Sequence, residues 1–107
     1  MMFIDDREIL ETLAKRVRRL YPEARVWAFG SRARGDATWE SDFDACIVLP
    51  QKDESAESAI RNICWEIGFE NNRVITTVIM DQSQFEDGPM SESTLVENIL
   101  REGVAAI

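Results

Sequence analysis

The sequence has no histidine and only two cysteines among its 107 residues. Without histidine, the chain lacks the commonest general base and the commonest zinc ligand, and it cannot form a Ser-His catalytic triad. Cys46 and Cys64 both lie among apolar neighbours, which indicates reduced core residues of a cytosolic protein. Histidine-dependent hydrolases and histidine-built zinc centres are therefore excluded.

Basic residues are scarce beside acids, with 12 lysines and arginines against 20 aspartates and glutamates, which gives a formal net charge of −8. Nonspecific binding to a nucleic-acid backbone needs a basic surface, so this balance opposes it. No apolar run reaches membrane-spanning length, and the N-terminus lacks the basic start and long apolar core of a signal peptide. We expect a cytoplasmic protein with no membrane segment.

The apolar pattern predicts one domain over residues 1–107, with helices and strands mixed along the chain. Three helices are expected: one capped by Asp5 or Asp6 and running to about Tyr21, one at about Glu54–Gly68, and one from Ser91 or Ser93 to Gly103. Three strands are expected, at Ala24–Phe29, Asp42–Leu49 and Arg73–Met80. A short connection favours antiparallel pairing of the first two strands, and the intervening helix favours a parallel crossover to the third. The expected fold class is α+β, a three-stranded mixed sheet with helices packed mainly on one face.

Two segments near the C-terminal end are expected to lie outside this sheet. Gln82–Pro89 is polar and acidic, which indicates an ordinary connector or a loop that moves over a site. The tail Val104–Ile107 is apolar. Because a three-stranded sheet with few helices leaves one apolar face short of cover, we expect this tail or the last helix to join a partner subunit.

The most informative residues are two acids that open the second strand. Side chains two apart on a strand point to the same face, so Asp42 and Asp44 present adjacent carboxylates while Phe43 turns the other way. Magnesium suits such a pair, because it takes one or two protein carboxylates and completes its shell with water and substrate phosphates. The pattern therefore favours a site for a metal-bound triphosphate, although a solvated strand entrance would also place acids here.

The bend before these acids supplies groups that suit phosphate. Gly30 lets backbone approach a ligand closely, and Ser31 offers a hydroxyl and an N–H at the start of a helical turn. Arg32 and Arg34 are placed either to steer a nucleotide or to form surface ion pairs with neighbouring acids. Trp39 is either a loop-packing residue or a contact for a nucleotide or partner.

Gly30-Ser31, ten residues and then Asp42-x-Asp44, with Arg32-Ala33-Arg34-Gly35 between them, resembles the signature of the minimal nucleotidyltransferases in the DNA polymerase β-like superfamily. The resemblance covers nearly the whole chain. It implies transfer of a nucleoside monophosphate from a nucleoside triphosphate, expected to be ATP, through two Mg²⁺ ions to a hydroxyl or similar acceptor. It further implies that Ser31, with Gly30 and Arg32, binds phosphate, and that Asp42 and Asp44 are the catalytic metal ligands.

The chain departs from this family at a third carboxylate, which complete members carry on a later strand. Thr76 or Thr77 stands in its place, with Thr76 taken as the matching position. A threonine hydroxyl neither supplies charge nor acts as a base near neutral pH. Asp81 and Glu70, at either end of that strand, are the nearest possible substitutes.

Two functions follow from this pattern, besides a generic domain without a ligand. The first is a magnesium-dependent nucleotidyltransferase whose acceptor is supplied by another protein. The second is a catalytically weak or inactive nucleotide-binding module of the antitoxin type, because minimal nucleotidyltransferases pair with helical HEPN-type proteins and modify or mask them. The expected partners are a nucleoside triphosphate and either a HEPN-like protein or further copies of this chain.

Overall fold

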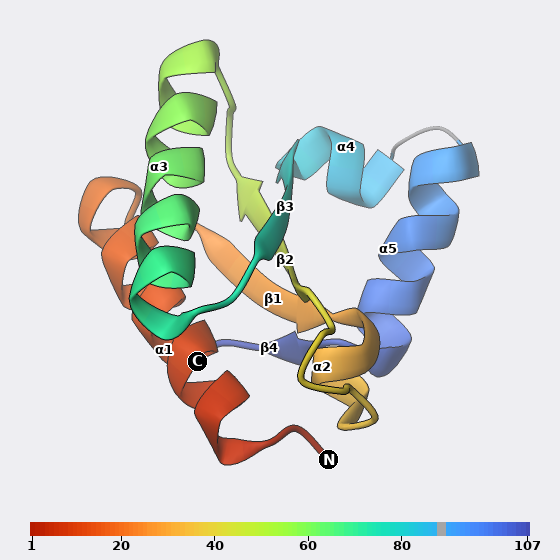
Figure 1. The fold of residues 1–107 in the computed structure, drawn as a ribbon. Helices are drawn as coiled ribbons and strands as arrows, with labels where there is room; N and C mark the ends of the chain where they lie inside the picture. The colour runs from red at the N-terminus through yellow and green to blue at the C-terminus, as the bar shows by residue number, and fades with distance from the viewer. Residues whose placement is uncertain (88–89) are drawn as a thin grey trace.

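The computed structural model describes residues 1–87 and 90–107 and has a mixed sheet between two layers of helices (Figure 1). The strands are β1 (Arg25–Phe29), β2 (Phe43–Leu49), β3 (Ile75–Asp81) and β4 (Val104–Ala105), in the order β3-β2-β1-β4. The helices are α1 (Ile4–Leu20), α2 (Gly30–Arg34), α3 (Glu54–Asn71), α4 (Gln82–Asp87) and α5 (Met90–Glu102). The α+β class with a mixed sheet is confirmed.

The pairing of the three longer strands follows the sequence prediction. β1 pairs antiparallel with β2, and β2 pairs in parallel with β3. In this register Asp44 lies opposite Phe29 on one side and opposite Thr76 on the other. The end of β1, the start of β2 and the start of β3 therefore meet around Asp44.

The expected three-stranded sheet gains a fourth strand from the apolar tail. The expectation that this tail or the last helix joins a partner subunit stays a prediction. Val104 and Ala105 pair antiparallel with Ala28 and Trp27 of β1. The chain turns back at Gly103, whose N–H donates to Ile99 O at 2.7 Å, directly after α5. A two-residue strand is too short to produce an alternating pattern, which is why the apolar tail gave no strand signal.

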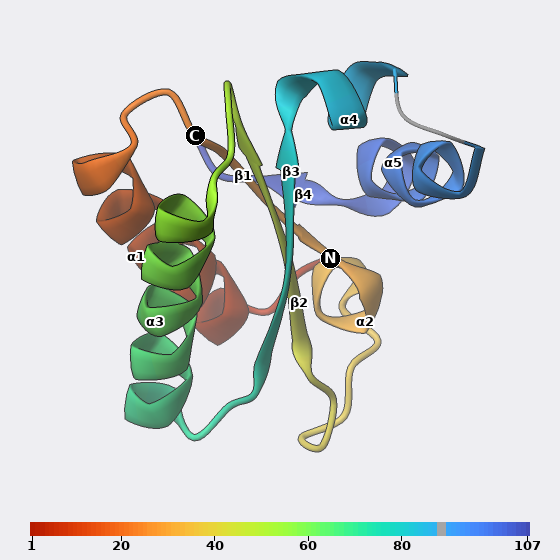
Figure 2. The ribbon, with the colours of Figure 1, turned by 90° about the horizontal axis from the view of Figure 1, so that it is seen from above.

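Helices cover both faces of the sheet, with the two longest on one of them (Figure 2). α1 and α3 bury the larger apolar cluster, which includes Leu10, Leu13, Ile47, Ile60 and Ile67. The opposite face, expected to be short of cover, carries α4 and α5, and its cluster comprises Cys46, Val48, Met80, Phe85, Val96 and Ile99. Within the described residues, no helix is long and apolar enough to cross a membrane.

The segment after β3 differs from expectation. Most of the connector predicted at Gln82–Pro89 is helix α4, because Phe85 is buried in the second cluster and Asp81 Oδ1 accepts the Gln84 N–H at 2.8 Å. Gly88 and Pro89 lie outside the described residues, as do the side chains of the expected caps Ser91 and Ser93.

The first helix has no acidic cap. α1 begins at Ile4, its N-cap residue is Phe3, and no side chain caps it. Asp6, predicted with Asp5 as a possible cap, is instead fully buried on the inner face of the helix. A buried carboxylate must be paired, so the partners of Asp6 show what this residue does in the fold.

Both cysteines are free and buried, as predicted. Burial raises the pKa of the Cys46 thiol to about 12 and also raises the pKa of Cys64, against a smaller opposing effect of the Thr77 hydroxyl. Because the thiolate is the reactive form, neither thiol is expected to react with Ellman's reagent in the folded protein at pH 8.5. Both should react after denaturation, when the pKa returns to about 8.5. Rapid labelling of the native chain would contradict this burial.

Candidate functional site

The turn between β1 and α2 requires glycine. Gly30 has φ 75°, in the left-handed region that side chains other than glycine disfavour. A Cβ atom at this position would collide with Asp44 Oδ2. The turn therefore brings the backbone at the start of α2 directly against the carboxylate of Asp44.

The two acids of the motif lie at the mouth of β2. Phe43 is fully buried in the larger cluster, whereas Asp44 is half-buried and Asp42, directly before the strand, is exposed. Among the residues that the structure describes, neither carboxylate forms a salt bridge. Two neighbouring acids without a basic partner leave negative charge that a cation can neutralise.

Thr76 faces Asp44 across the parallel pair. Its hydroxyl donates to Asp44 Oδ1 at 2.8 Å, whereas the Thr77 hydroxyl points to the other side of the strand and donates to Cys64 Sγ. Of the two threonines, Thr76 is therefore the one beside the acids. No group of three or more acidic, cysteine or histidine ligands occurs in the described part of the chain.

The two acids considered as substitutes lie elsewhere. Glu70 binds Arg16 on the surface, with 3.0 Å between Arg16 NH2 and Glu70 Oε2. Asp81 lies opposite Leu49, five residues along β2 from Asp44, and caps the first turn of α4. Neither carboxylate shares the position of Thr76.

Ser31 lies in the first turn of α2 and is half-buried. Its backbone carbonyl accepts the N–H groups of Gly35 at 3.0 Å and Asp36 at 3.2 Å. Within residues 1–87 and 90–107, its hydroxyl has no hydrogen-bond partner. The hydroxyl is therefore available to a ligand beside the Gly30 turn.

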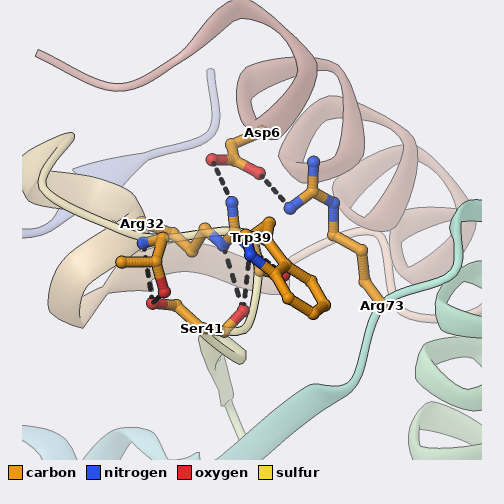
Figure 3. Close-up of polar contacts among 6 residues, drawn as sticks. Asp6, Arg32, Trp39, Ser41 and Arg73 are labelled. Carbon is orange, nitrogen blue, oxygen red and sulfur yellow. Dashed lines mark hydrogen bonds and ion pairs between the residues drawn. The ribbon is translucent and has the colours of Figure 1, made fainter.

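Arg32 does not face the surface as a phosphate-binding residue would. Its side chain is 5% exposed and lies between the carboxylate of Asp6 and the loop before β2 (Figure 3). Arg32 NH2 donates to Ser41 O at 2.9 Å and to Trp39 O at 3.5 Å, and NH1 donates to Asp6 Oδ2 at 3.5 Å. The guanidinium thus holds the residues that lead directly into Asp42.

Asp6 connects this loop to β3 as well. Its Oδ1 lies 3.4 Å from Arg73 NH1, as an ion pair without hydrogen-bonding geometry. One buried carboxylate therefore joins α1, the arginine of α2 and the chain entering β3. Sequence reasoning missed this network, because Asp6 and Arg73 are 67 positions apart and no local pattern links them.

The other two candidates in the motif are exposed. Arg34 donates to Asp36 at 3.1 Å and to Glu102 at 3.3 Å, which confirms surface pairing, and these hydrogen bonds raise the pKa of its guanidinium. Trp39 is 86% exposed, so it is not a loop-packing residue. Its alternative role as a contact for a nucleotide or partner stays a prediction.

Comparison with known proteins places this geometry in context. A family model described as a nucleotidyltransferase domain matches residues 10–105. A candidate nucleotidyltransferase from Sulfolobus solfataricus has a similar structure, with a TM-score of 0.61 and 17% identity over 95% of this chain and 79% of that chain. A toxin–antitoxin structure with AMP-PNP has a TM-score of 0.62 and 15% identity over 89% of this chain and 70% of that chain. No curated protein matches the chain.

The buried network predicts a large stability effect for Asp6→Asn. This change leaves the Arg32 guanidinium buried without its counter-charge, so the free energy of unfolding should fall by about 3–5 kcal/mol in a denaturant titration. Glu70→Gln, which breaks the exposed pair with Arg16, is the matched control and should change it little, because solvent screens that pair. Equal small effects in both variants would show that the network is not structural.

Proposed function

Because this chain belongs to the nucleotidyltransferase domain family, we propose that it binds a nucleoside triphosphate where β1, α2 and β2 meet. The observation that carries the proposal is the approach of the Gly30 turn to Asp44, beside the unoccupied hydroxyl of Ser31. A polyphosphate needs a close backbone, a hydrogen-bond donor and a way to share space with carboxylates. The Gly30 turn supplies the first and the Ser31 hydroxyl the second, and a cation shared with the carboxylates would supply the third.

The donor set at this junction suits magnesium. Asp42 and Asp44 are hard oxygen ligands with no basic partner among the described residues, and we assign both expected Mg²⁺ ions to them. When bound, magnesium neutralises charge on the phosphates and orients them for displacement. Thr76 donates to one oxygen of Asp44 and so fixes the direction in which the other faces.

The remaining roles, phosphate binding and positioning, are assigned to the neighbouring residues. The Ser31 hydroxyl is assigned to the β- and γ-phosphates, and Gly30 to the close backbone approach. Arg32 is assigned a positioning role rather than the phosphate contact predicted from sequence, because its donors are already committed to Asp6 and to two carbonyls. It acts on the nucleotide through the loop that carries Asp42.

The residues at this site support nucleotide binding better than they support nucleotidyl transfer. Attack by an acceptor hydroxyl benefits from a base, and the threonine at position 76 cannot accept that proton near neutral pH. We propose that transfer of a nucleoside monophosphate, with ATP as donor, is slow and that a separate protein supplies the acceptor.

A second candidate function is a nucleotide-binding module of the antitoxin type that masks a HEPN-like partner. Two observations favour it: the threonine beside Asp44, and the similarity to a toxin–antitoxin structure with AMP-PNP, an analogue of ATP. In this case the chain would bind and mask the partner directly, and no label would be transferred.

The nucleotide site is tested by titrating ATP in excess Mg²⁺ into the purified chain by calorimetry. Asp42→Asn/Asp44→Asn should weaken binding at least about tenfold, because a tenfold change is only about 1.4 kcal/mol and two metal ligands are lost. Asp36→Asn removes an exposed acid of the same loop that pairs with Arg34 and should leave the affinity unchanged. Equal binding by the double variant would overturn the site.

Transfer and masking are separated by incubating the chain with labelled ATP, Mg²⁺ and the product of the neighbouring gene. Label that moves to that product with the native chain, but not with Asp42→Asn/Asp44→Asn, supports transfer. Inhibition of the partner that persists in the double variant, without labelling, supports masking and contradicts the enzyme.

Thr76→Asp tests the position of the third carboxylate. An aspartate beside Asp44 would supply both charge and a base, so transfer should rise by roughly a hundredfold, within the range of general-base catalysis. Thr76→Asn is the matched control, because it has nearly the same shape without charge, and it should give no gain. If Thr76→Asp binds ATP normally and shows no gain, position 76 is not the missing acid's place.

A further inference from the structure

A groove of about 490 Å³ lies between α3 and β3, next to the carboxylate site. Trp65 and Phe69 of α3 stack on each other along it, with ring centroids 5.4 Å apart. Their exposed fractions are 68% and 74%, and that of Val74 at the groove's end is 64%. Large apolar side chains gathered in this way on a surface mark an interaction site more often than scattered ones do.

The groove runs along an open edge of the sheet. β3 pairs with β2 alone, and Val74 O accepts the Phe43 N–H, so the peptide groups of Ile75, Thr77 and Ile79 point away from the sheet. An edge of this kind is a template for a further strand. The other outer strand is the two-residue β4.

Cations, rather than a strand, protect this edge. Arg61 NH1 contacts Thr77 O and Lys52 Nζ contacts Ile79 O, each at 3.4 Å. Both contacts are long for hydrogen bonds, so an incoming N–H would replace them at little cost. The two displaced side chains would then be free to pair with acids on the segment that displaced them.

The charge of the groove differs from that of the molecule. The chain carries −8 in total, yet Arg61 lines the groove and Lys52 lies along its edge, and neither forms a salt bridge among the described residues. The third base, Arg73, also lines the groove but is already paired with Asp6. Charges beyond a Debye length of about 8 Å are largely screened at physiological salt, so these local bases decide what the groove attracts. An acidic ligand complements them.

We propose that the edge of β3 binds an extended acidic segment of a partner polypeptide, which adds to the sheet as a strand. Arg61, Trp65 and Phe69 stand four residues apart on α3 and line the same groove, so they all meet the face of such a strand that is turned toward α3. Alternate side chains share a face, so apolar residues and acids that take turns at every second position reach the aromatic rings and Arg61. Aromatic and arginine side chains are the residues that most often carry binding energy at interfaces. Docking of this kind does not depend on nucleotidyl transfer.

Thr76 lines the groove, and its hydroxyl donates to Asp44 Oδ1 on the neighbouring strand β2. The Thr77 hydroxyl points to the other side of β3 and donates to Cys64, which also lines the groove. A segment paired with the outer edge of β3 would therefore be separated from the Asp44 carboxylate by β3 itself.

The probe is a synthetic ten-residue peptide in which valine and glutamate take turns at every second position, with threonine and one tyrosine at the positions between them, titrated into ¹⁵N-labelled full chain. Amide shifts are expected at Ile75, Thr77 and Ile79, together with a shift of the Trp65 indole N–H. A peptide with lysine in place of glutamate should bind at least about tenfold more weakly. Arg61→Glu should reverse this preference between the two peptides.

The aromatic contact has its own matched pair of variants. Trp65→Ala should weaken binding of the acidic peptide at least about tenfold, whereas Trp39→Ala, which removes a still more exposed tryptophan outside the groove, should not. Unchanged amide shifts outside α3 would show that Trp65→Ala remains folded.

Three results would overturn the proposal. The first is an absence of shifts along β3 with the acidic peptide, and the second is equal binding of the acidic and basic peptides. The third is a set of the same β3 shifts that appears in the chain alone as its concentration rises, because the occupant would then be a second copy.

Discussion

The guanidinium of Arg32 is the interaction on which the candidate site depends. It is buried, and it binds a carboxylate from α1 and two carbonyls from the loop before β2. A buried charge is tolerated only with such partners, so the loop cannot move without leaving the guanidinium unpaired. The exposed acid Asp42 follows directly after this anchored loop, so the loop fixes where Asp42 lies. A helix-turn motif that looks like a phosphate contact in sequence is thus, in the fold, a support for the loop that leads to Asp42.

Much of the fold follows from local pattern. The apolar run that follows Asp44 and ends at Leu49, the helical spacing over α3 and the length of the connections predicted the antiparallel and parallel pairs that the structure contains. Since register has a period of two, these pairs also set Thr76 rather than Thr77 beside Asp44. The sequence therefore led to the neighbourhood of the two acids and to the threonine that faces them.

The parts that sequence reasoning missed all depend on distant contacts. Asp6 has the position of a cap, and only the approach of Arg32 and Arg73 in the folded chain shows that it is an internal counter-ion. β4 is stabilised by β1 rather than by its own composition. The connector after β3 is helical because Phe85 has a place in the core. In each case tertiary contact overrides a weak local preference.

The unequal edges of the sheet limit how copies of the chain can polymerise. At one end the outer strand is β4, whose two residues are too short to template a further strand, while at the other the seven-residue β3 is open within the described sheet. Fibre growth by strand addition needs a free edge on both sides of every unit, so that each addition exposes a new one. A unit open on one side stops after a single encounter. The molecule can keep one edge accessible without becoming the repeating unit of a filament.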